Sequence, residues 1–243
     1  MNFKIIIAIA FIVTAAFSSF GCGSNEKKSS GSSNAAALLI APQTPQQKEE
    51  AKEAFSKAES YYNAGKYSEA VDSYTKAINA KEKSVFIYCE RGNAYQALGD
   101  SASALADYMT AIEIGQMNAK QNEQNSTDPL SMFMAYNARG DIYHKQSDLV
   151  NAIENYTKAI ELRDNLGHGV GAPAISNAFG NRGDCFKEQG DVARAIADYS
   201  KAIEVSPKTA KFFKNRGLAH RQLGNEAQAE ADLAKAQELE AKK

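Results

Sequence analysis

Tryptophan is absent from the 243 residues of this chain, and cysteine, histidine and proline are rare, with three, three and five copies. The cysteines stand far apart, at positions 22, 89 and 185, so they offer neither the close spacing of a zinc site nor a disulfide framework. The formal net charge is −1, so no overall field attracts the chain to nucleic acid. The sequence is instead rich in alanine and punctuated by glycine, which favours helices.

The usual sequence signatures of an enzyme are also missing. None of the three histidines stands in a His-Glu-x-x-His motif, and no Gly-x-Ser-x-Gly motif occurs. The glycine-rich segment 167–175 has neither a predicted strand before it nor the Lys-Ser or Lys-Thr that a phosphate-binding loop requires. We therefore predict a protein that is not an enzyme, with no catalytic residue, no metal and no cofactor.

The first 21 residues predict a signal peptide. Lys4 precedes an apolar run from Ile5 to Phe17, whose length of about 13 residues is too short to span a hydrocarbon core of ~30 Å. Small residues, including Gly21, follow the run, as they do before a cleavage site. Residues 22–47 are mostly polar and predict a flexible linker. Two interpretations of its apolar patch 35–40 stay open: a sticky piece of linker, or a segment that docks on the first helix.

One pattern recurs along the rest of the chain. Glycine follows arginine four times, and an alanine stands twelve residues after each of these glycines. These pairs are Gly92 and Ala104, Gly140 and Ala152, Gly183 and Ala195, and Gly217 and Ala229. A divergent copy comes first, with Ala58 in the glycine position and Ala70 twelve residues later. The spacing is 34 residues between the first two copies and between the last two, so 34 is the period.

This pattern resembles the tetratricopeptide repeat, which has a period of 34 residues and the signature W-x2-L-G-x2-Y, then A-x3-F, then P. The resemblance covers residues 51–84, 85–118, 133–166, 176–209 and 210–243, with insertions at 119–132 and 167–175. Tyr88, Tyr136, Phe179 and Phe213 stand where the signature has tryptophan. The resemblance implies an all-α fold, in which residues 48–243 form a right-handed α-solenoid of five helix-turn-helix repeats. The first helices would line its concave groove.

The residues around each glycine suggest how the two helices of a repeat meet. A glycine inside a helix costs about 1 kcal/mol relative to alanine, which is tolerated if a second helix must approach closely there. The arginines that precede the glycines are Arg91, Arg139, Arg182 and Arg216, and the residues sixteen positions after them are Asp107, Asn155, Asp198 and Asp232. This matching favours structural ion pairs or hydrogen bonds between helices over ligand binding.

The resemblance also implies which first-helix residues face the groove. From the first repeat to the last, the predicted groove residues are Phe55, Glu59 and Tyr62, Phe86, Cys89 and Asn93, Asn137, Asp141 and His144, Gly180, Asp184 and Lys187, and Lys211, Lys214 and Arg221. They change from aromatic at the N-terminal end to basic at the C-terminal end. Lys211 and Asn215 partly match a carboxylate clamp known in such grooves, but Asp184 stands where an asparagine is needed, so no clamp is predicted.

A second resemblance concerns the end of the signal peptide. Ser19-Phe20-Gly21-Cys22 is similar to the lipobox of bacterial lipoproteins, in which the cysteine is lipidated and becomes the mature N-terminus. This implies acyl chains such as palmitate on Cys22, and two or more chains anchor a protein stably. The anchoring membrane would be the outer membrane, on its periplasmic side or at the surface, in a Gram-negative host. In a Gram-positive host it would be the outer face of the plasma membrane. An ordinary secreted protein is the alternative.

These features predict a lipid-anchored adaptor or assembly factor in the bacterial cell envelope. Its groove would bind a segment of a partner protein, since extended and helical segments dock into grooves with side-chain pockets. A self-associating scaffold, and therefore a homo-oligomer, is the first alternative. A lipoprotein that binds a small ligand or a glycan is the second, because Phe55, Tyr62 and Phe86 place aromatic rings at one end of the groove.

Overall fold

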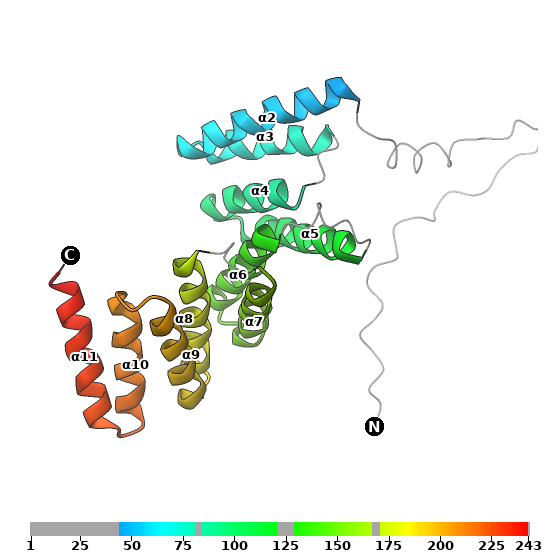
Figure 1. Cartoon of the computed structure of the whole chain (residues 1–243). Coiled ribbons are helices and arrows are strands. Elements are labelled where there is room, and N and C mark those ends of the chain that lie inside the picture. Colours follow the sequence, from blue (N-terminus) through cyan, green and yellow to red (C-terminus); the bar gives the residue numbers. More distant parts are fainter. Residues whose placement is uncertain (1–43, 81–83, 121–128, 167–170, 243) are drawn as a thin grey trace, which may run out of the picture. The chain divides into compact units, whose positions relative to one another are not determined.

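The computed structural model describes residues 44–80, 84–120, 129–166 and 171–242, without the side chains of residues 120 and 163–166. All regular structure in these ranges is helical, in five consecutive helix pairs (Figure 1). The helices are α2 (Pro45–Asn63), α3 (Tyr67–Asn79), α4 (Val85–Ala97), α5 (Ser101–Lys120), α6 (Pro129–Lys145), α7 (Leu149–Leu166), α8 (Ala172–Glu188), α9 (Val192–Val205), α10 (Ala210–Gln222) and α11 (Glu226–Glu240). The predicted all-α repeat fold is confirmed. The predicted signal peptide, Cys22 and residues 23–43 of the linker lie outside the described residues.

The helices begin earlier than the repeat pattern predicts. Thr44 caps α2: its hydroxyl accepts a hydrogen bond from the Gln47 backbone N–H at 3.2 Å, and the Gln47 side chain accepts one from the Thr44 N–H at 3.0 Å. This capping box, with Pro45 in the first turn, makes residues 45–47 helical rather than linker. Likewise, the ends of both predicted insertions, residues 129–132 and 172–175, form the first turns of α6 and α8.

A residue in the left-handed region closes the turn between the two helices of every pair. Four of these residues are glycines with φ between 72° and 87°: Gly65, Gly99, Gly190 and Gly224. The fifth is Ser147, with φ 60°, the one non-glycine residue with positive φ in the described part of the chain. Three of the residues that follow cap the second helix: Asp100, Asp148 and Asp191 each accept a backbone N–H, at 3.0 to 3.2 Å.

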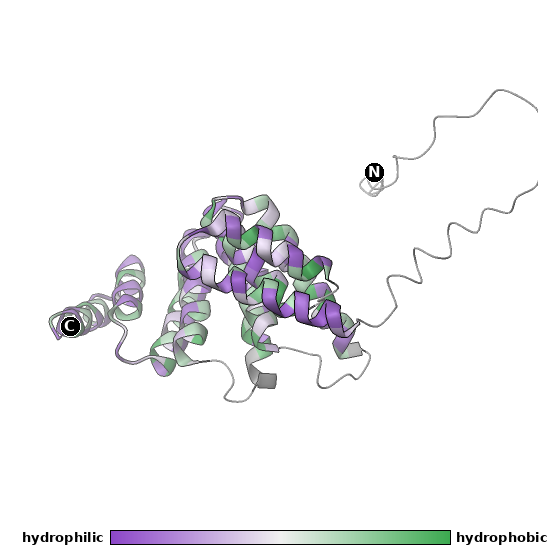
Figure 2. Cartoon of the chain, turned by 90° about the horizontal axis from the view of Figure 1, so that it is seen from above, coloured by the Kyte–Doolittle hydropathy of each residue, from purple (hydrophilic) through white to green (hydrophobic). Residues whose placement is uncertain are grey.

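The helices pack mainly against their neighbours in the sequence. In addition, first helices of successive pairs contact one another: α4 with α6, α6 with α8, and α8 with α10. Second helices have no contacts of comparable extent with one another in the described ranges. The first helices therefore lie on the inner side of the stack, as the resemblance implied. Hydrophobic and hydrophilic residues are mixed along the helices (Figure 2), and the separation into an apolar and a polar face is clearest in the second helices α3 and α9.

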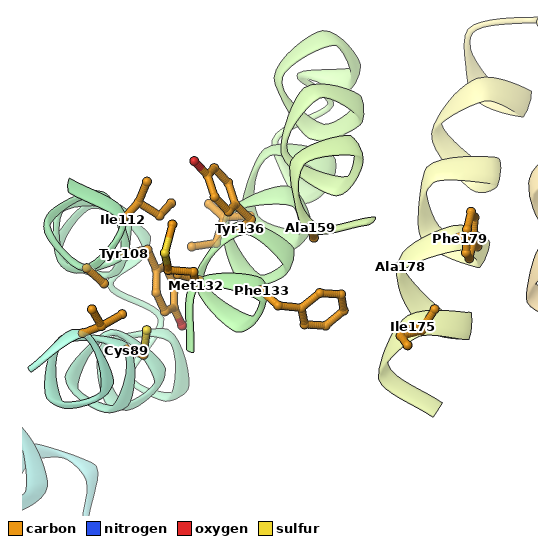
Figure 3. Packing of buried hydrophobic residues seen from close by; sticks show 14 of the residues in the cluster. Cys89, Tyr108, Ile112, Met132, Phe133, Tyr136, Ala159, Ile175, Ala178 and Phe179 are labelled. Carbon is orange, nitrogen blue, oxygen red and sulfur yellow. The ribbon is translucent and has the colours of Figure 1, made fainter. Parts of the chain in front are cut away.

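The core forms between the helices of a pair and between neighbouring pairs. The alanines of the pattern are fully buried, and so are the tyrosines four residues after them: Tyr74, Tyr108, Tyr156 and Tyr199. Figure 3 shows the largest cluster, in which Tyr108 of α5 lies near Met132 and Tyr136 of α6. No single pair could bury these side chains alone, so the stack of pairs is the stable unit. In the described part of the chain, no helix has the length and hydropathy needed to cross a membrane.

Candidate functional site

Three of the four arginines of the pattern join neighbouring repeats. Arg91, Arg182 and Arg216 each donate two parallel hydrogen bonds, of 2.7 to 2.8 Å, to the two carboxylate oxygens of an aspartate on the second helix. The aspartates are Asp107, Asp198 and Asp232, which are buried. The remaining amino group of each guanidinium donates at 3.0 Å to a hydroxyl on the preceding repeat, from Thr75, Thr157 and Ser200 respectively. We call this arrangement, of arginine, aspartate and hydroxyl, the arginine bridge.

The third repeat has no arginine bridge. Arg139 makes no hydrogen bond to Asn155 within the described residues, and the Asn155 side chain donates instead to the backbone carbonyl of Asn151 at 2.8 Å. The position that carries the hydroxyl in the other bridges is Met109. Both partners of Arg139 are thus replaced together, Asn155 in its own repeat and Met109 in the preceding one. This joint replacement supports a structural role for the arginines.

The glycines after these arginines lie against the buried tyrosines of the second helices. A Cβ atom on Gly92, Gly140 or Gly183 would come within 2.6 to 2.9 Å of a ring carbon of Tyr108, Tyr156 or Tyr199. No side chain larger than hydrogen therefore fits at these positions without a shift. At Gly217 the nearest atoms are the Ala229 carbonyl oxygen and Leu233, each at 3.1 Å.

The hydroxyls of the same tyrosines reach the inner side of the stack. Each donates a hydrogen bond of 2.7 Å to the residue that follows the glycine: Tyr108 to Asn93, Tyr156 to Asp141 and Tyr199 to Asp184. All three acceptors are predicted groove residues, and each is half-buried. The buried tyrosines therefore fix the orientation of one polar group per repeat along the inner side. In the last repeat, Leu218 and Leu233 replace the acceptor and the tyrosine.

Asparagines of the following repeats complete two of these polar groups. Asn181 donates to Asp141 at 3.0 Å, and Asn215 donates to Asp184 at 2.8 Å. Burial raises the pKa of the Asp141 carboxyl, and the hydrogen bonds from Tyr156 and Asn181 offset only part of this rise. Asn137 lies on α6 in the third repeat, four residues before Asp141. Its side-chain oxygen is buried and has no hydrogen-bond partner among the described residues.

The two ends of the inner side differ in chemistry, as the sequence predicts. At the N-terminal end, the centroid of the Phe55 ring lies 5.7 Å from that of the Phe86 ring and 5.8 Å from that of the Tyr74 ring. The ring centroids of Tyr62 and Tyr67 lie 5.3 Å apart. Glu59 of the same helix is exposed.

The C-terminal end carries the cations. Lys211, Lys214 and Arg221 of α10 are exposed, and Lys187 of α8 is half-buried. The Lys211 ammonium lies 3.4 Å from an Asp184 oxygen. Between the two ends, His144 Nε2 lies 3.0 Å from a carboxylate oxygen of Glu188. The predicted groove residues therefore form two chemically distinct ends rather than one compact site.

Two of the predicted groove residues do not line it. Cys89 is 1% exposed, and its thiol donates to the Ser131 carbonyl of α6. Gly180 is buried against the ring of Phe212 in α10. The predictions for these two positions were wrong, because at both places the next repeat packs onto the first helix.

The fold is thus an α-solenoid of stacked helix pairs, and comparison with known proteins identifies the repeats. Models described as tetratricopeptide or TPR repeats match residues 58–99, 87–114, 131–208 and 181–242. The described helices are therefore tetratricopeptide repeats.

The curated relatives match only about half of this chain. RNA polymerase II-associated protein 3 is 28% identical over 127 residues in mouse and over 109 residues in human. These regions cover 49% and 45% of this chain, and 19% and 14% of the relatives. The chain thus spans less than a fifth of their length.

Solved structures support the same fold. A crystal structure of MamA is 21% identical, with a TM-score of 0.62, and the match covers 76% of this chain and 95% of that one. MamA of Desulfovibrio magneticus RS-1 is 16% identical with a TM-score of 0.65, covering 83% and 99%. YrrB, described as a TPR protein with an unusual peptide-binding site, is 20% identical with a TM-score of 0.58, covering 80% and 88%. The TM-scores show that these proteins share the fold of this chain, and at such low sequence identities the similarity shows the fold alone.

Proposed function

We propose that this chain is a non-catalytic adaptor, which binds a segment of a partner protein along the inner side of its first helices. The observation that carries the proposal is the row formed by Asn93, Asp141 and Asp184. These polar groups occur once in each of the second, third and fourth repeats, and buried tyrosine hydroxyls hold them in place. A row of oriented hydrogen-bonding groups suits an extended or helical segment. The peptide-binding site described for the similarly folded YrrB supports a peptide as the ligand.

Site-specific photocrosslinking in the native host tests this proposal. A photoreactive amino acid replaces Asn177, which is exposed on the first helix α8, or, as the matched control, Glu154, which is exposed on the second helix α7. We expect an adduct with a different protein from position 177 and none from position 154. An adduct with twice the mass of the chain would instead favour the self-associating scaffold. No adduct from either position would contradict both proposals.

The predicted basic end gives this experiment a second variant. Replacing Lys211, Lys214 and Arg221 with glutamine removes three positive charges from the inner side. The matched control removes three charges from lysines of second helices whose side chains are 43 to 56% exposed: Lys158, Lys201 and Lys235. If the basic end contributes to binding, the first variant loses the adduct and the control keeps it. An adduct of equal yield in both would place the contact elsewhere on the inner side.

We further propose that the chain is held at a membrane of the bacterial cell envelope by acyl chains on Cys22. The proposal rests on the signal-peptide pattern and the lipobox-like sequence that ends at this residue. The polar sequence after it would act as a tether. Its r.m.s. reach would be roughly 25–30 Å, which lets the repeats bind a partner at some distance from the membrane.

A Cys22→Ser variant of the full chain tests the anchor. Without the thiol no acyl chain can be attached, so we expect the variant in the soluble fraction and the unchanged chain in the membrane fraction. Ser24→Ala, two residues away, is the control and should stay with the membrane. A Cys22→Ser variant that also stays with the membrane would exclude lipidation as the anchor.

A further inference from the structure

The N-terminal end of the inner side combines aromatic rings with two carboxylates. Phe55, Glu59 and Tyr62 follow one another at helical spacing on α2, and Phe86 and Glu90 lie four residues apart on α4. The Phe55 and Phe86 rings are in contact across the two helices, and Phe86 is 37% exposed. We call these five residues the N-terminal subsite. Glu90 was not among the predicted groove residues.

The two carboxylates of this subsite lie close to each other and to the rings. Burial raises the pKa of the Glu90 carboxyl, and the negative charge of Glu59 raises it further. The charge of Glu90 in turn contributes to the raised pKa of Tyr62 and of the buried Tyr74. Neither glutamate forms an ion pair with any residue that the structure describes. Among the described residues, the one side-chain hydrogen bond to the Glu90 carboxylate is long, at 3.4 Å from the Asn93 amide.

The same positions elsewhere in the chain show how such a carboxylate is satisfied. In the last two repeats, Asp184 accepts a hydrogen bond from Asn215, and the Lys211 ammonium lies 3.4 Å away. The residues of the first two repeats that match Asp184, Asn215 and Lys211 in register are Glu59, Glu90 and Phe86. A second carboxylate thus replaces the amide donor, and an aromatic ring replaces the cation.

We propose that the N-terminal subsite binds a lysine or arginine side chain of the partner segment. The inference rests on the proposed function and names the chemistry of its ligand. An incoming cation would take the place that Lys211 fills in the last repeat, paired with Glu59 and Glu90. Its charge and its aliphatic stem would lie on the rings of Phe55 and Phe86, which attract cations through their electron-rich faces. A partner segment with a basic residue at one end would therefore bind in one direction.

A synthetic peptide array tests the inference with the full chain in mild detergent. Fluorescent twelve-residue peptides of random sequence are screened, and the affinity of each bound peptide is measured by fluorescence anisotropy. Each arginine of a bound peptide is then replaced by citrulline, and each lysine by norleucine, which remove the charge and keep most of the shape. We expect one such replacement to weaken binding by about tenfold or more.

Two variants locate the effect. Replacing both Glu59 and Glu90 with glutamine should weaken binding of the basic peptide, and should abolish the difference between arginine and citrulline. Replacing Glu154 and Glu230 with glutamine removes two charges from exposed positions on second helices, and should leave that difference intact. Thermal unfolding followed by circular dichroism checks that both variants are folded.

The outcomes separate this inference from the proposed function. If peptides bind but citrulline or norleucine makes no difference, or if the Glu59 and Glu90 variant keeps the full difference, the inference is overturned and the adaptor function stands. If no peptide binds the unchanged chain, the adaptor function is overturned together with the inference.

Discussion

An Arg182→Ala variant is expected to lose about 3–5 kcal/mol of unfolding free energy. The substitution leaves Asp198 buried without its partner, and an uncompensated buried charge costs about this much. The side chains of Arg182 and Asp198 are only 17% and 7% exposed, so solvent screens the pair weakly. The loss also removes the hydrogen bond to Thr157 of the preceding repeat. Urea unfolding followed by far-UV circular dichroism measures the effect.

The matched control is Arg139→Ala. Arg139 stands at the same position of the third repeat but lacks an arginine bridge, since Asn155 and Met109 replace the aspartate and the hydroxyl. We expect this variant to lose about 1 kcal/mol or less. Equal losses in the two variants would show that the bridge itself adds nothing, and that the arginines act only through the packing of their side-chain stems.

A Gly140→Leu variant is expected to lose about 1–3 kcal/mol through overpacking. Even a Cβ atom would come within 2.6 Å of a Tyr156 ring carbon, so the tyrosine or the helix would have to shift. The tyrosine is fully buried, and its hydroxyl is held by Asp141 at 2.7 Å. The shift would therefore disturb both the contact between the helices and the polar row on the inner side. Thermal unfolding of the variant measures the loss.

Gly171→Leu serves as the control for this second prediction. Gly171 is exposed, and a Cβ atom there would meet only a Pro173 carbon at 3.8 Å. The new side chain at this helix N-cap should cost less than about 1 kcal/mol. If the melting temperature of Gly140→Leu matched that of the unchanged chain, the contact between Gly140 and Tyr156 would not be as tight as described.

The repeats were predictable because the packing of the two helices within each repeat requires particular residues at a fixed spacing in the sequence. Gly140 and Tyr156 belong to one repeat, sixteen residues apart, and the same spacing recurs around Gly92 and Gly183. Contacts within a repeat therefore appear in the sequence as a constant interval. The start of α2 was harder to predict from the sequence, because the Thr44 capping box lies before the first copy of the pattern.

Contacts between repeats were not predictable in the same way. The hydroxyl partner stands sixteen residues before Arg91 but twenty-five before Arg182, because an insertion separates the third and fourth repeats. Only when Thr75, Thr157 and Ser200 are compared in register does the regularity appear. Burial of Gly180 by Phe212 and the position of Glu90 beside Glu59 also depend on how neighbouring repeats dock. One repeat taken alone does not show them.

The missing arginine bridge has a consequence for how the repeats respond to temperature. Three of the four junctions between repeats carry a hydrogen bond from a charged arginine bridge. The junction of the second and third has no such charged contact: apolar packing, such as that of Met132 against Gly115, holds it together with uncharged hydrogen bonds from Gln116 to Tyr136 and from Cys89 to Ser131. Apolar contacts weaken on cooling, while the cost of desolvating paired charges is largest in the cold and falls on warming. The junctions therefore do not share one thermal response. On cooling, the array would first loosen between α5 and α6, into a block of two repeats and a block of three.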